Sequence, residues 1–234
     1  MIPIRDDNPH FLTPYVTYAL VAANVLVWLG VQGGGAGLPL AQSVCTLGLV
    51  PGELLGRLPP GFGVPLGQGL SCVVDQAPNP YTLLSHMFLH GSWMHLLGNL
   101  WFLWIFGNNV EDSMGHVRFA VFYVLCGLVA AAFQIASQPD SGVPMVGASG
   151  AIGGIMGAYV VLYPWVNVHL LVWVFFYVTV FVVPAVWMLG YWFLMQMVSG
   201  LVSVGGQGGG VAFWAHVGGF VAGAALIFLF RDSR

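Results

Sequence analysis

Ser149 is the residue of this 234-residue chain whose setting first suggests chemistry. It is the only hydroxyl in the first two turns of an apolar run, residues 144–163, where Gly147, Ala148 and Gly150 surround it. A lone serine in an apolar helix usually bonds to its own backbone or fills a packing position. It acts as a nucleophile only when a base lies close enough to accept its proton.

His216, in the last apolar run, is the candidate base. Glycines follow each polar residue at helical spacing: Gly153 and Gly157 after Ser149, Gly219 and Gly223 after His216. Each predicted helix therefore has a bare face below its polar residue, and two such faces can approach to near backbone contact. The hydroxyl and the imidazole would then hydrogen-bond, as nucleophilic acyl transfer requires. The alternative is a small-residue packing seam.

No aspartate or glutamate occurs within an apolar run, so the predicted site is a Ser–His dyad whose imidazole is oriented by packing. His95 and Asn99 are spaced i and i+4 on a predicted helix, and both can donate hydrogen bonds to an oxyanion beside the backbone N–H of Ser149. His86 and His90 have the same spacing, and we interpret them as structural residues that anchor a long loop.

The spacing of His86 and His90 also suits two zinc ligands. Met87 stands where an H-E-x-x-H motif has glutamate, and no buried carboxylate or cysteine offers a third ligand. We therefore expect no metal and no cofactor.

The composition is that of an integral membrane protein. Hydrophobic residues make up 58% of the chain and charged residues 6%, against about 25% charged in a soluble domain. There is no basic run to indicate nucleic-acid binding. We predict a single all-α membrane domain over residues 1–234, embedded in lipid, with six spans at about 14–31, 81–106, 119–136, 145–163, 168–197 and 211–230. Pro184 predicts a kink in the fifth span.

The loops between the predicted spans differ in length and content. Residues 33–80 form a long first loop, in which Cys45 and Cys72 either form a disulfide or remain two buried thiols. A short loop, residues 107–118, contains Glu111.

Orientation follows from the arginines. Arg5, Arg118, Arg231 and Arg234 collect on the side of both termini and Arg57 on the other, so both termini are expected in the cytoplasm and the long first loop outside.

Four motifs in order resemble those of the rhomboid family of intramembrane serine proteases. They are Gly147-Ala148-Ser149-Gly150, His90-x-x-x-x-His95-x-x-x-Asn99, Gly107-x-x-x-Glu111-x-x-x-Gly115 and Ala215-His216-x-x-Gly219-x-x-x-Gly223. The resemblance implies a six-span bundle of bacterial type with a buried hydrophilic site. From the size and the topology of the chain, we expect a bacterial inner membrane.

For the residues, the resemblance implies that Ser149 is the nucleophile, His216 the general base, and His95 and Asn99 the oxyanion-stabilising pair. It also implies structural roles for Glu111 and the two remaining histidines. Transmembrane protein substrates, single-span ones above all, would enter between the second and fifth spans, with the loop after the fifth as a cap. A Trp-Arg or Tyr-Arg pair of the family is replaced here by Tyr81-Thr82, which removes an arginine anchor of the first loop.

The sequence thus predicts a serine endopeptidase that cleaves membrane-anchored proteins within or near the outer side of the bilayer. One alternative is a catalytically silent rhomboid-like protein that binds membrane clients. The other is a small metal or solute transporter that uses the histidines.

Overall fold

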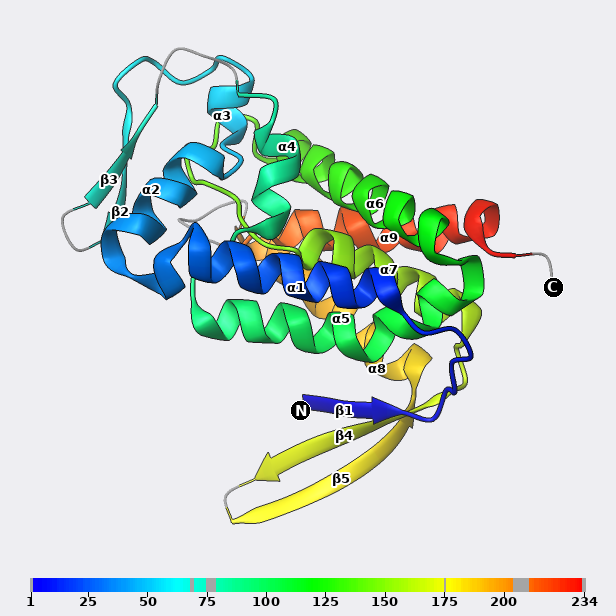
Figure 1. Cartoon of the computed structure of the whole chain (residues 1–234). Helices are drawn as coiled ribbons and strands as arrows, with labels where there is room; N and C mark the ends of the chain where they lie inside the picture. Colours follow the sequence, from blue (N-terminus) through cyan, green and yellow to red (C-terminus); the bar gives the residue numbers. More distant parts are fainter. Residues whose placement is uncertain (1, 68–69, 75–78, 175, 204–210, 233–234) are drawn as a thin grey trace.

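The computed structural model describes residues 2–67, 70–74, 79–174, 176–203 and 211–232. Its main body is a bundle of six longer helices, with a smaller loop region at one end and a β-sheet along one side (Figure 1). The six helices are α1 (Tyr15–Gly30), α5 (Trp93–Met114), α6 (His116–Ser137), α7 (Ser149–Leu162), α8 (Ala185–Ser203) and α9 (Phe213–Phe230).

Helix α7 is the centre of the bundle. Ten of its 14 residues are buried, and it packs most extensively on α9 and α6. Its sequence, SGAIGGIMGAYVVL, contains no charged residue, and six of its first nine positions are glycine, alanine or serine. Such a helix can be surrounded by neighbours on every side. The candidate nucleophile therefore begins the most enclosed helix of the fold.

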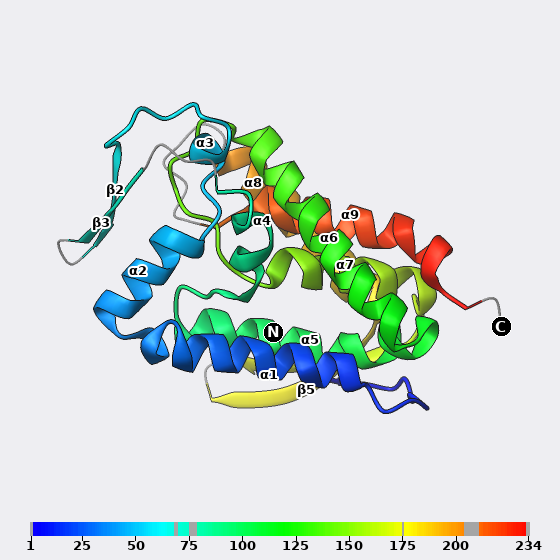
Figure 2. The ribbon, with the colours of Figure 1, turned by 45° about the horizontal axis from the view of Figure 1, so that its top comes forward.

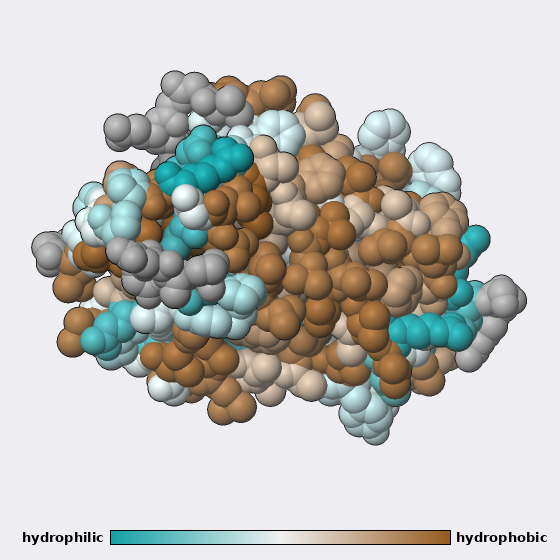
Figure 3. All heavy atoms as spheres, turned by 90° about the horizontal axis from the view of Figure 1, so that it is seen from above, coloured by the Kyte–Doolittle hydropathy of each residue, from teal (hydrophilic) through white to brown (hydrophobic). Residues whose placement is uncertain are grey.

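The bundle has the surface of a membrane protein. Seen from above, apolar atoms cover the middle of the molecule, and hydrophilic residues gather toward its two ends (Figure 3). Among the described residues, α6, α8 and α9 are long and apolar enough to cross a membrane, while α1 and α7 are shorter apolar helices. The six-span count thus stays a prediction, although each predicted span overlaps one of the six helices.

The long first loop is structured, as Figure 2 shows at the end of the bundle away from the C-terminus. Cys45 and Cys72 form a disulfide that joins a helix of this loop to a short hairpin. The elements here are the 3₁₀ turn Gly33–Gly35, α2 (Gly37–Leu47), α3 (Pro51–Leu54) and the antiparallel strands β2 (Gly63–Gly67) and β3 (Leu70–Val73).

The predicted second span is not one helix. It contains α4 (Thr82–Ser85), a 3₁₀ turn over His86–Phe88, an extended stretch, and only then α5. His86 and His90 therefore do not share a helical face, contrary to the i, i+4 interpretation. The predicted loop at residues 107–118 is also wrong, because α5 continues to Met114 and the chain turns at Gly115, with φ +77°.

The first half of the predicted fifth span is a β-hairpin, so the all-α prediction is wrong here. Strands β4 (Asn167–Val174) and β5 (Tyr177–Pro184) pair with each other, and β4 also pairs with β1 (Ile2–Asp6) at the N-terminus. The segment is rich in valine and aromatic residues, which favour strands, and hydropathy alone does not separate such a run from a helix. Pro184 ends β5 directly before α8 and kinks no helix.

Two side-chain hydrogen bonds join β1 of the three-stranded sheet to the bundle. Trp101 Nε1 of α5 donates to the Pro3 carbonyl at 2.5 Å, and Tyr159 Oη of α7 donates to Asp6 Oδ2 at 2.5 Å. The sheet therefore lies against α5, as Figure 1 shows.

Candidate active site

Ser149 lies at the first position of α7, after a segment held in place by backbone hydrogen bonds. The Gly147 N–H donates to the His86 carbonyl at 2.9 Å, and Met145 and Leu49 exchange hydrogen bonds of 2.7 and 3.0 Å. Gly147 has φ +129°, a conformation that favours glycine. Because α7 starts at Ser149, its first N–H groups have no partner within the helix and are free to bind an acceptor.

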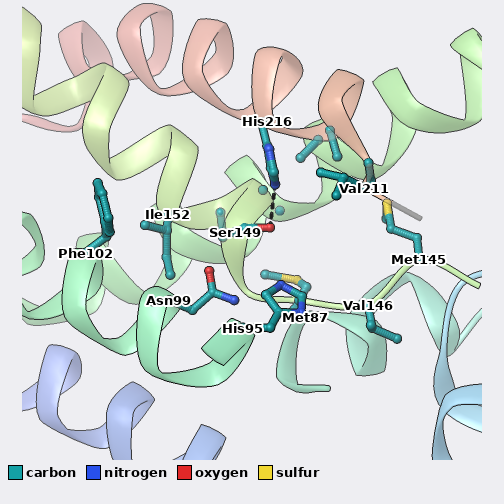
Figure 4. A pocket seen from close by; sticks show the side chains of 18 of the residues that line it. Met87, His95, Asn99, Phe102, Met145, Val146, Ser149, Ile152, Val211 and His216 are labelled. Carbon is teal, nitrogen blue, oxygen red and sulfur yellow. Dashed lines mark hydrogen bonds between the residues drawn. The ribbon is translucent and has the colours of Figure 1, made fainter. Parts of the chain in front are cut away.

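His216, in the first turn of α9, contacts Ser149 directly. Its Nε2 lies 2.7 Å from Ser149 Oγ, and Figure 4 shows the two side chains meeting between their helices. The predicted pairing of this serine with this histidine is therefore present in the structure.

Glycines bring the two helices together. A Cβ added to Gly219 would lie 1.9 Å from the Gly150 carbonyl oxygen, and one on Gly223 would lie 1.8 Å from that of Gly154. A Cβ on Gly153 would lie 3.1 Å from the His216 carbonyl oxygen. The backbones of α7 and α9 thus touch where any larger residue would separate them, and this contact sets the Ser–His distance.

The other ring nitrogen of His216 has a partner that the sequence analysis missed. Nδ1 lies 2.8 Å from Oε1 of Gln196, in α8, and the ring of Trp192 lies 5.9 Å from the imidazole, centroid to centroid. The prediction that packing alone orients this histidine is therefore incomplete. The signal was available, since Gln196 is the one amide side chain in α8.

His95 and Asn99 are both on α5 and line the same cavity as Ser149. Ser92 caps α5 by accepting from the His95 N–H at 3.1 Å. The Gly91 N–H donates to His95 Nδ1 at 3.3 Å, so Nε2 carries the proton of the neutral ring. Asn99 is 7% exposed, and its Nδ2 has no hydrogen-bond partner among the described residues. Two donors thus remain available on the side of Ser149 away from His216 (Figure 4).

The cavity has a volume of about 650 Å³ and lies among α5, α7, α8 and α9. Apolar residues such as Phe102, Ile152 and Trp192 make up much of its lining, with few polar groups around Ser149. It is large enough for an apolar peptide segment to reach the hydroxyl.

His86 and His90 are both buried, and His86 lines the cavity. His86 Nδ1 donates to the Thr82 carbonyl at 2.7 Å, and its own carbonyl holds Gly147. Gln32 clamps the backbone of His90 with two 2.8 Å hydrogen bonds. Within the described residues there is no group of three or more histidine, cysteine, aspartate or glutamate residues placed to hold a metal ion.

At the Tyr81-Thr82 positions the first loop is anchored without an arginine. Tyr81 Oη donates to the Thr46 carbonyl at 3.0 Å, and Ser85 Oγ donates to the Leu47 carbonyl at 2.6 Å. These bonds and the disulfide hold the first loop. The loop after the fifth span, which is predicted to act as a cap, has its glycine-rich residues 205–210 outside the described residues.

Glu111 is fully buried in α5 and binds the start of α1. Its carboxylate accepts from the N–H groups of Val16 and Thr17 at 2.9 and 2.8 Å, and from Thr17 Oγ1 at 2.7 Å. His116 Nδ1 lies 2.6 Å from the same carboxylate. The residue therefore caps another helix, where the helix dipole favours a negative charge.

Residues 77–233 match the family model of the rhomboid domain, which is more than half of the chain. The chain belongs to the rhomboid family. With its apolar helices, this membership makes it an integral membrane protein.

Similar proteins include bacterial and plant members of the family. The rhomboid protease GlpG of Salmonella paratyphi A is 30% identical over 149 residues, which cover 62% of this chain and 46% of that protein. The Arabidopsis thaliana RHOMBOID-like protein 5 is 33% identical over 78 residues, covering 33% and 25%. The chloroplastic Rhomboid-like protein 11 of the same plant is 35% identical over 85 residues, covering 36% and 30%. The matched segment thus spans less than half of each relative.

Proposed function

We propose that this rhomboid protein is an intramembrane serine endopeptidase that cleaves membrane-anchored, single-span proteins with a Ser149–His216 dyad. The observation that carries the proposal is the 2.7 Å contact between Ser149 Oγ and His216 Nε2 beside a cavity with two free donors. Similarity to the rhomboid protease GlpG supports the same reaction class.

In the first step, His216 Nε2 takes the proton of Ser149 Oγ as the oxygen bonds to the carbonyl carbon of the scissile peptide. The negative charge on the carbonyl oxygen is stabilised by His95 Nε2–H, Asn99 Nδ2–H and the backbone N–H of Ser149. His216 then gives the proton to the leaving nitrogen, the C–N bond breaks, and an acyl-enzyme remains.

In the second step, water from the outer side adds to the acyl carbon while His216 accepts its proton. Collapse of this second intermediate breaks the bond to Oγ and returns the proton to Ser149. Among the described residues, no aspartate, glutamate, lysine or arginine lines the cavity around these atoms. An apolar surrounding strengthens the hydrogen bonds to the oxyanion, which compensates for the absence of a carboxylate in the dyad.

The topology proposed with this function puts both termini in the cytoplasm of a bacterial cell. Arg118 pairs with Asp232, and the Asp232 N–H donates to the Ser113 carbonyl, so the C-terminus meets the α5–α6 turn. Arg57 pairs with Asp140 at 3.2 Å in the other loop region. The arginine distribution therefore supports cytoplasmic termini and an outward site.

The rival proposal is a silent rhomboid-like protein that binds clients without cutting them. The intact Ser149–His216 pair favours the enzyme, because client binding needs neither residue.

The test is cleavage of a single-span reporter by the purified full chain in liposomes. We expect Ser149→Ala and His216→Ala each to abolish cleavage, and a fluorophosphonate probe to label the wild type but not Ser149→Ala. Leu194→Ala, an exposed position of α8, is the control that should cleave normally. Cleavage that persists in Ser149→Ala would refute the assignment.

A further inference from the structure

Gln196 connects α8 to the candidate dyad. Its Oε1 lies 2.8 Å from His216 Nδ1, while His216 Nε2 lies 2.7 Å from Ser149 Oγ. The three side chains form one hydrogen-bonded chain that joins α8, α9 and α7. Gln196 also lines the cavity, one turn after Trp192, whose ring lies 5.9 Å from the imidazole and is tilted by 37° to it.

We propose that Gln196 is a positioning residue for His216 and completes a Ser149–His216–Gln196 triad; this rests on the proposed protease function. The amide oxygen accepts only when Nδ1 carries the proton, which leaves the lone pair of the neutral ring on Nε2. Nε2 is the nitrogen that faces Ser149 Oγ, so this tautomer is the one that can accept the serine proton. Without the acceptor, the ring would be free to place its proton on either nitrogen and to rotate.

A neutral acceptor suits this location. A carboxylate on an apolar helix would have to be desolvated, at a cost that an amide does not carry. The amide oxygen can accept the same Nδ1–H in the neutral ring and in the imidazolium that forms during attack. Gln196 therefore provides the orientation that an aspartate gives in soluble serine proteases, without placing a charge in the membrane.

In this triad, the tautomer of His216 that can accept the serine proton depends on the packing of α8 against α9. Only three of the 19 residues of α8 are buried, against ten of 14 in α7. Movement of so weakly enclosed a helix away from α9 would break the Gln196–His216 bond before it disturbed the α7–α9 contact. The histidine is then in its productive tautomer only while α8 lies against it.

The kinetic test compares Gln196→Leu and Gln196→Glu with a neighbouring control, Met195→Leu, an exposed position of α8. Loss of one orienting hydrogen bond predicts about a tenfold lower kcat for Gln196→Leu, with little change in KM. Gln196→Glu restores an acceptor and should recover kcat at alkaline pH. Because its negative charge favours the imidazolium, the acidic limb of its pH–rate profile should move to higher pH.

A second measurement determines which ring nitrogen of His216 carries the proton. In ¹⁵N-histidine NMR spectra of the full chain, with His216 assigned from His216→Ala, the wild-type ring should be protonated at Nδ1. Gln196→Leu should show a mixture of tautomers. Wild-type kcat together with an unchanged ring signal in Gln196→Leu would overturn the proposal. A wild type that neither cleaves nor reacts with fluorophosphonate would instead refute the protease function, and the NMR comparison would still decide the Gln196 bond.

Discussion

Replacing Gly219 by alanine tests whether the backbone contact between α7 and α9 sets the geometry of the dyad. The new Cβ would lie 1.9 Å from the Gly150 carbonyl oxygen, and a real Cβ essentially never approaches closer than 3.0 Å. The obstacle is backbone, so no side chain can rotate away. The helices must therefore separate by at least about 1.1 Å, the difference between these two distances.

This separation acts on the reacting atoms directly. Gly150 follows Ser149, and Gly219 lies one turn after His216, so the displaced segments carry both side chains. Adding about 1.1 Å to the 2.7 Å Ser149–His216 distance gives about 3.8 Å, beyond hydrogen-bond range. A misplacement of about 1 Å costs roughly 100-fold in rate. We expect Gly219→Ala to lose about that factor in kcat.

The assay is reporter cleavage in liposomes, with thermal unfolding in detergent to show that the variant is folded. Two alanine variants calibrate the effect: Gly153→Ala, whose Cβ would lie 3.1 Å from the His216 carbonyl oxygen, and Gly190→Ala, which meets nothing within 4 Å. The loss should be large for Gly219, small for Gly153 and absent for Gly190. A folded Gly219→Ala with wild-type kcat, or a greater loss at Gly153, would show that the glycine contact does not set the dyad distance.

Two further predictions concern residues outside the dyad. Glu111→Gln should lower the free energy of unfolding by about 2 kcal/mol, because the amide cannot accept from every donor that the buried carboxylate satisfies; unchanged thermal unfolding would contradict this. For Asp6, burial raises the pKa of the carboxyl above its ordinary value. Relative to Asp6→Asn, the wild type should therefore lose stability as pH rises through this raised pKa, and a stability difference that is constant from pH 4 to 8 would contradict it.

The parts of the site that the sequence predicts depend on short, regular patterns. The pairing of Ser149 with His216 follows from two isolated polar residues and the glycines spaced behind them. Helical periodicity determines which residues share a face of a helix. Small residues on that face allow a neighbouring helix to approach closely. His95 and Asn99 are placed on one side of α5 by the same argument, and the structure puts both beside the cavity.

The parts that the sequence does not predict are those that hydropathy does not determine, such as whether an apolar segment forms a helix or a strand. Residues 168–184 are as apolar as a helical span, yet β4 and β5 form a hairpin there, and β4 also pairs with β1, about 165 residues away in sequence. The hydrogen bond between Gln196 and His216 depends on how α8 and α9 are rotated relative to each other. The residue pattern within one helix does not determine that rotation. Glu111 is expected in a short loop, whereas the structure places it in α5, where its carboxylate accepts from the start of α1.

The site combines a fixed pair with a movable third member. Ser149 and His216 are held by helix backbones in contact, where the glycines leave no freedom to shift. The acceptor for Nδ1 comes instead from α8, in which only three of 19 residues are buried. In a membrane, a nucleophile that is always paired with a competent base could attack any peptide that reaches it. Placing Gln196 on the least enclosed of the six longer helices makes competence of the base conditional on how that helix is docked, while the distance between the reacting atoms stays constant.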